Sequence, residues 1–153
     1  MQRSTRIVYL NAADPVPQPD LLRSGAAGCA WLDPDGAFEL DTRVRISPNS
    51  THALLGHGVV AELNALPLEG TLGEGLEALI PPAHLDTARS LFFEADRKTY
   101  GARYEFVVET QEIPERIEYR VKIDNREYQS TLSHLTFLMS VASREGLAAW
   151  IRI

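Results

Sequence analysis

The sequence predicts an α+β fold, a five- to six-stranded antiparallel sheet covered on one face by short helices and one longer helix. Segments that alternate apolar and charged residues lie on both sides of a central region of short helical segments. That region is interrupted by glycines and by Pro81-Pro82, which a long helix does not tolerate. With 153 residues, 44% of them hydrophobic, the chain can form one domain with a sizeable core.

An N-terminal flanking segment, residues 1–25, is expected to precede a main domain at residues 26–153. Arg6–Leu10 favours a short strand because β-branched and aromatic residues dominate it. Asp14–Pro19 contains three prolines and is expected to be a linker or loop. The flanking strand could pair with the edge of the sheet or with a second subunit.

The main domain is expected to begin with a hairpin and a capped helix. Gly28–Leu32 is apolar, Asp33–Gly36 has turn residues at the required positions, and Phe38–Ile46 largely alternates. Ser47-Pro48 supplies an N-cap and a first-turn proline, and Gly56 ends the predicted helix.

The central region is expected to supply the helical cover of the sheet. Residues 56–75 contain five glycines around a short apolar segment. Glu74–Leu79 is predicted to be a helical turn that Pro81-Pro82 ends. Ala83–Asp96 is the strongest helix prediction, because its apolar residues recur every three or four positions.

The C-terminal third is predicted to be mainly strands. Ala102–Thr110 and Arg116–Asp124 alternate in the manner of half-buried strands. Leu132–Val141 fits a strand and a helix equally well, and we favour a strand because Ser and Thr fill alternate positions. Leu147–Ile153 would close the sheet. A chain ending on a strand without a polar tail suggests a domain excised from a longer protein.

The charge, hydropathy and cysteine content of the chain restrict its expected binding partners and its expected location in the cell. The formal net charge is −6, from 21 acidic and 15 basic residues, and no basic cluster exceeds Arg97-Lys98. Such a surface opposes binding to nucleic acid. No apolar run approaches the ~18 residues of a membrane span, so no membrane partner is expected. Cys29 is the only cysteine, which favours a reducing, cytoplasmic location.

No motif of catalysis or metal binding is present. The chain contains neither a Gly-x-Ser-x-Gly elbow nor His-x-x-x-His or Cys-x-x-Cys spacing. Gly70–Gly75 lacks a lysine and carries Glu74, which suits a flexible connection better than a phosphate loop. We therefore expect a protein that is not an enzyme and holds no metal.

Four short motifs follow one another in the main domain. They are Trp31–Gly36, Ile46–Gly56, Leu68–Gly70 with Leu76–Pro81, and His84–Phe92. In this order they resemble a PAS domain, the small sensory module of bacterial signalling proteins, over roughly residues 26–153. In that pattern Ala102–Thr110 and Arg116–Asp124 compete for one strand position.

The resemblance implies a cup that holds a small molecule. Its candidate lining residues are Trp31, His84, Phe92, Phe106, Tyr119 and Phe137. Haem would need His84 as its axial ligand, although a first-turn position favours an ordinary structural histidine. Cysteine-based flavin photochemistry is excluded because Cys29 lies in the first predicted strand. The identity of any cofactor stays open.

The expected function is a non-enzymatic sensory or protein-interaction module of bacterial signal transduction. It would bind a small ligand or a partner and relay that event through a homodimer or through contacts with a partner signalling domain. The alternative is a toxin-neutralising immunity protein or inhibitor that covers a basic partner with an acidic surface. The candidate residues of that surface are Glu109, Glu112, Glu115 and Glu118.

Overall fold

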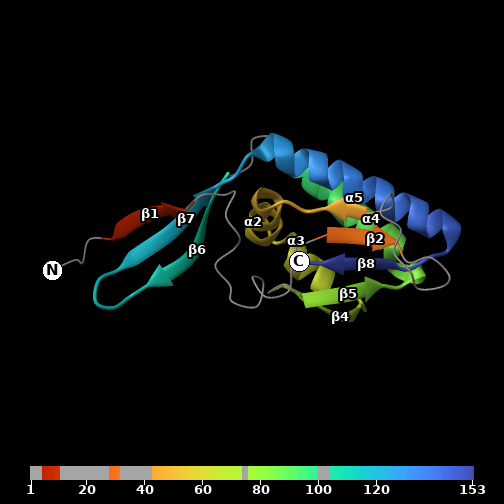
Figure 1. Cartoon of the computed structure of the whole chain (residues 1–153), viewed down its shortest axis with the longest axis horizontal. Coiled ribbons are helices and arrows are strands. Elements are labelled where there is room, and N and C mark those ends of the chain that lie inside the picture. The colour runs from red at the N-terminus through yellow and green to blue at the C-terminus, as the bar shows by residue number, and fades with distance from the viewer. Residues whose placement is uncertain (1–4, 11–27, 32–42, 74–75, 100–103) are drawn as a thin grey trace.

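The computed structural model describes residues 5–10, 28–31, 43–73, 76–99 and 104–153. These residues form an α+β fold with two sheets (Figure 1). One sheet has three strands in the order β1-β7-β6, and the other has five in the order β3-β2-β8-β5-β4. The predicted α+β class is confirmed. The expectation that all strands share one sheet is wrong, because alternation shows that a face is buried but not against which element.

The C-terminal strand occupies the central position of the five-stranded sheet. Its members are β2 (Gly28–Trp31), β3 (Arg43–Arg45), β4 (Glu69–Gly73), β5 (Leu76–Ile80) and β8 (Ala149–Arg152). β8 pairs antiparallel with both β2 and β5. The antiparallel pairing of β2 with β3 confirms the two strands of the first predicted hairpin. Its turn, like the proline-rich segment at residues 14–19, lies outside the described residues.

The helical turn predicted at residues 74–79 is replaced by strand β5. Ala78 and Ile80 are buried while Leu79 between them is only half-buried, so the segment follows a period of two. Ala78 is the register partner of Ile151 on β8. This pairing is formed with a strand distant in sequence, and the local pattern of five residues does not reveal it.

The helices of the described residues pack against this sheet and against one another (Figure 1). They are α2 (Pro48–Gly56), α3 (Val59–Asn64), α4 (Leu85–Lys98) and α5 (Asn125–Glu145), with a 3₁₀ turn, η2 (Pro82–His84), before α4. Ser47 caps α2 as predicted, because its hydroxyl accepts a hydrogen bond from the Ser50 N–H at 3.2 Å. The predicted helix at residues 83–96 is confirmed as α4.

The strand favoured at Leu132–Val141 is wrong, because this segment lies within α5. Buried residues at three- and four-residue spacing face the core, and they are Leu132, Leu135, Met139 and Ala142. The hydroxyls that favoured a strand donate to carbonyls four residues earlier, as Thr136 does to Leu132 at 2.8 Å. Asp124 caps the start of the helix, and Gly146 ends it with φ of +67°.

The three-stranded sheet projects from the rest of the molecule (Figure 1). It consists of β1 (Arg6–Leu10), β6 (Glu105–Gln111) and β7 (Ile117–Lys122), with β7 in the centre. β1 runs parallel to β7 and β6 antiparallel to it. The two predicted strands at residues 102–124 therefore do not compete for one position. We call residues 6–10 and 104–123 the arm, and the five-stranded sheet with its four helices the body.

Candidate functional site at the arm and its junction

An aromatic cluster joins the arm to the body. The His57 ring, just after α2, stacks on Tyr128 of α5 with 5.1 Å between ring centroids and 6° between planes. The same ring meets Phe106 of β6 at 4.8 Å in an edge arrangement. A Cβ added at Gly56 would lie 2.5 Å from Cγ of Phe106. Because Gly56 has no side chain, the Phe106 ring of the arm can pack directly on the end of α2.

Buried polar contacts fix the start of α5 beside this cluster. The Asn49 side chain donates from Nδ2 to the Asp124 carbonyl at 3.0 Å and accepts from the Asp124 N–H at 2.8 Å. The hydroxyls of Ser50 and Thr131 lie 2.7 Å apart and share a hydrogen bond. Asn49 and Ser50 are both buried. These bonds hold α2 against the point where β7 of the arm leads into α5.

Two polar atoms of the aromatic cluster are buried without a partner among the described residues. They are Nε2 of His57 and the hydroxyl of Tyr128. Burial lowers the pKa of His57. Burial, together with the negative charges of Glu62 and Asp96, raises the pKa of Tyr128. Both groups are therefore neutral near pH 7, and both retain unused hydrogen-bonding capacity that a small polar molecule could satisfy.

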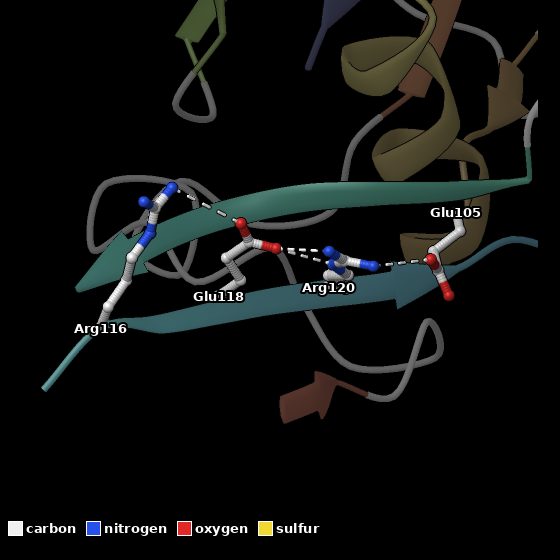
Figure 2. A network of polar contacts seen from close by, with 4 residues as sticks. All are labelled: Glu105, Arg116, Glu118 and Arg120. Carbon is white, nitrogen blue, oxygen red and sulfur yellow. Dashed lines mark hydrogen bonds and ion pairs between the residues drawn. The ribbon is translucent and has the colours of Figure 1, made fainter. Parts of the chain in front are cut away.

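A row of alternating charges covers one face of the arm (Figure 2). Nη2 of Arg116 lies 3.8 Å from a carboxylate oxygen of Glu118. Arg120 donates from Nε to Glu118 at 3.0 Å and from Nη1 to Glu105 of β6 at 3.2 Å. Figure 2 shows the four side chains following one another along β7 and across to β6. Such a row ties β6 to β7 on their solvent side.

Exposed apolar side chains flank this row of charges. Of the eight large hydrophobic residues exposed in the described part of the chain, five belong to the arm: Ile7, Tyr9, Tyr104, Val107 and Ile113. Tyr9 and Val107 are both register partners of Arg120, and Ile7 is the partner of Glu118. Register partners share a face of a sheet, so these apolar groups and the charges form one mixed surface.

The six predicted pocket residues are placed in separate parts of the molecule. Phe92, on α4, is fully buried in the core, whereas Phe137 is exposed on α5. Tyr119 is half-buried on β7, and Phe106 belongs to the junction. The other two are His84, half-buried at the end of η2, and Trp31, at the end of β2. Among the predicted pocket residues whose side chains the structure describes, Phe106 alone joins the cluster described above.

The four predicted surface glutamates all lie on the arm, but they are not equivalent. Glu109 and Glu112 are exposed. Glu115 is 3.6 Å from Arg6, and Glu118 belongs to the row of ion pairs. Arginines therefore offset part of the negative charge that the sequence suggested for this surface.

Sequence reasoning missed His57, Tyr128 and Asn49 as members of a site. His57 belongs to no motif in the sequence, and Tyr128 lies outside the segment Leu132–Val141 for which a strand is favoured. The one available signal was Gly56, which was interpreted as a helix end. Its second role, leaving space for Phe106 fifty positions later, cannot be seen from local sequence.

Within the described ranges no three potential metal-ligating side chains gather into a group. The helices among those residues include none with the length and apolar character to cross a membrane. Comparison with protein-family models, with curated proteins and with solved structures finds no match.

Proposed function

We propose that this protein is a non-enzymatic sensory or protein-interaction module of bacterial signal transduction, and that the arm is its interacting element. The observation that carries the proposal is the concentration of exposed large apolar residues on the arm, five of eight in the described part. Contiguous exposed apolar surface with polar neighbours is typical of protein interaction sites.

The junction supports a sensory role because it links three elements through one ring cluster. Phe106 belongs to the arm, while His57 and Tyr128 belong to the body. A small polar ligand that bonds to Nε2 of His57 or to the Tyr128 hydroxyl would favour one packing of these rings. In this mechanism the ligand shifts the arm between two packings on the body by its differential affinity for them.

The PAS-like character of the body is part of the proposal. It is supported by an antiparallel sheet with helices packed against it, in which the last strand, β8, pairs with the first, β2. The hairpin of β6 and β7, inserted between α4 and α5, adds an element for which the PAS-like sequence pattern had only one strand position. The relay would pass through contacts of the arm with a second copy or a signalling domain, in the cytoplasm.

The alternative function, an immunity protein or inhibitor with an acidic surface, draws support from the exposed carboxylates of Glu109 and Glu112. The ion pairs of Glu115 and Glu118 with arginines of the arm leave less net charge for a basic partner. Mixed apolar and paired-charge surface fits the first proposal better. Co-purification with a basic nuclease at low salt, lost on Glu109→Gln and Glu112→Gln substitution, would favour the alternative.

A melting-temperature screen against a metabolite library tests the sensory proposal. We expect at least one compound to raise the melting temperature, since a ligand at 100 times its Kd stabilises a protein by ~2.7 kcal/mol. Tyr128→Phe keeps the ring and removes the buried hydroxyl, so it should reduce the shift. Tyr104→Phe, which removes an exposed hydroxyl, is the matched control. A library without any stabilising compound, or shifts unaffected by Tyr128→Phe and His57→Gln, would contradict ligand sensing at this junction.

A further inference from the structure

Strand β1 has one side that no described strand uses. The Arg6 N–H donates to the Arg116 carbonyl at 2.9 Å, and the two strands run parallel in register. In such a ladder alternate residues bond to the neighbouring strand, so Arg6, Val8 and Leu10 direct their backbone groups toward β7. Ile7 and Tyr9 direct theirs the other way, where no strand of the described residues pairs with β1.

Among the residues that the structure describes, this open edge shows no proline, bulge or covering strand, and its one charged residue is Arg6. Proteins protect sheet edges with charges, prolines, bulges or covering elements. The two residues whose backbone faces the open edge are Ile7 and Tyr9, with 43% and 51% of their surface exposed. β1 pairs with β7 in unbroken register, whereas β6, at the opposite edge of the arm, has a register shift between Val107 and Glu109. The β1 edge is therefore the more suitable template for an added strand.

The five residues of β1 are complementary to themselves. We consider two copies of β1 that lie antiparallel, with the two Val8 residues opposite each other. Ile7 of each copy then lies opposite Tyr9 of the other. Because these are the residues with outward backbone groups, both of their N–H groups and both of their carbonyls find partners in each copy. The facing pairs are aromatic with β-branched, which stabilises antiparallel strands. Arg6, the one charged residue of β1, faces Leu10, so no like charges meet.

We propose that β1 pairs antiparallel with β1 of a second copy of this chain, in a register centred on Val8. The two arms then form one continuous six-stranded sheet, with the order β6-β7-β1 followed by the same strands of the other copy in reverse. This inference deepens the proposed function, since it names the partner of the interaction module, and it rests on that proposal. Pairing two five-residue strands is expected to bury less surface area than a standard stable interface, which buries ~1,200–2,000 Å². The dimer is therefore expected to depend on concentration.

Disulfide cross-linking tests the register of the proposed β1–β1 pairing directly. In the proposed dimer the two Val8 residues form a non-hydrogen-bonded pair with Cα atoms about 4.5 Å apart, which a disulfide can bridge. We expect Val8→Cys, in a Cys29→Ala background, to form a reducible covalent dimer under mild oxidation. Ile7→Cys is the control, because the two copies of residue 7 would lie on a diagonal of about 7–8 Å. Equal cross-linking of both variants, or none for Val8→Cys, would overturn the register.

A proline test separates dimerisation from folding of the arm. Tyr9→Pro removes an N–H that faces the open edge, and Tyr9→Ala removes the same side chain but keeps that N–H. In sedimentation equilibrium we expect Tyr9→Pro to dimerise at least about tenfold more weakly than Tyr9→Ala, with similar melting temperatures for dilute samples. Wild-type protein that stays monomeric at all concentrations, or a dimer unaffected by Tyr9→Pro, would overturn the proposal. In either case the metabolite screen still tests the sensory function by itself.

Discussion

The body and the arm are held together in different ways. In the body, large side chains of the helices and of the sheet are fully buried, among them Leu54, Phe92, Leu135 and Ile151. In the arm, Val121 is buried on one face while Ile7 and Tyr9 of the neighbouring strand are exposed. Val121 belongs to the core cluster, and backbone ladders and ion pairs join the strands of the arm to one another. We therefore expect stability to be concentrated in the body and the exposed surface of the arm to be available for contacts.

A sheet of three strands needs a packed face or a support to be stable. For the arm that support is the junction, where Phe106 packs on Gly56 and His57. The Ile123 N–H also donates to the Tyr104 carbonyl at 2.7 Å, which continues the pairing of the arm to its base. The junction is thus the place where a change in the body can alter the arm.

The largest loss of unfolding free energy is expected from a substitution that creates a cavity in the body. Leu135→Ala removes a side chain with no exposed surface from α5 and should lower the free energy of unfolding by ~2–5 kcal/mol. Phe137→Ala, on the same helix but 67% exposed, should change it by less than ~0.5 kcal/mol. Urea denaturation measures both. Equal costs would contradict the assignment of α5 as a helix with one buried face.

A smaller loss of unfolding free energy is expected from a substitution at the junction. Gly56→Ala places a Cβ 2.5 Å from the Phe106 ring and should cost ~1–3 kcal/mol through overpacking. In a Phe106→Ala background the added Cβ loses its three nearest contacts, so the same substitution should cost less. A double-mutant cycle from denaturant unfolding gives the coupling. If Gly56→Ala has the same cost in both backgrounds, the ring does not pack on α2 as described.

Local signals in the sequence predicted the elements whose ends and faces are set by nearby residues. Ser47 caps the start of α2, Gly56 is its last residue, and the apolar periodicity of α4 required no distant partner. The strands at residues 6–10 and 117–122 followed from alternation and strand propensity. Their division between two sheets could not be predicted, because it depends on pairings such as that of β1 with β7, over a hundred residues apart.

Two segments were misassigned because local and distant preferences differ there. The pattern at residues 76–80 fits a helical turn, and pairing with β8 makes it a strand. Serine and threonine in α5 suggested a strand, and hydrogen bonds within the helix accommodate them. Of the candidate site, only Phe106 and the position of the glutamates were predicted. The meeting of Phe106 with His57 and Tyr128 arises from tertiary packing alone.

The row of charges on the arm should contribute less than the junction. Arg120→Ala removes the residue that pairs with Glu118 and Glu105, and its side chain is 27% exposed. Ion pairs this accessible to solvent contribute little to stability, and salt weakens them further. We expect the loss on Arg120→Ala to shrink at high salt, whereas Arg97→Ala, on the surface of α4, should have little effect at any salt concentration. A loss independent of salt would show that Arg120 acts through packing.

The smallest expected effect is a pH dependence from His57. Its pKa in the folded protein is lowered below 6.5 by burial, so the unfolded chain binds a proton that the folded chain does not. The stabilisation is complete above pH 6.5 and is lost as the pH falls through the lowered folded pKa. Denaturant unfolding at about pH 7.5 and pH 5.5 should show a smaller pH effect in His57→Gln than in wild type. An equal change in both proteins would contradict the burial of a neutral His57.

Amide hydrogen exchange measures directly whether the arm is a separately stabilised element that is supported at the junction. Amides of α5 and β8 should exchange with the free energy of global unfolding, and those of β1, β6 and β7 with a smaller one. Phe106→Ala should lower the protection of the arm much more than that of the body. Equal opening free energies for arm and body, with an equal loss of protection in both on Phe106→Ala, would show that the arm is not a separately stabilised element.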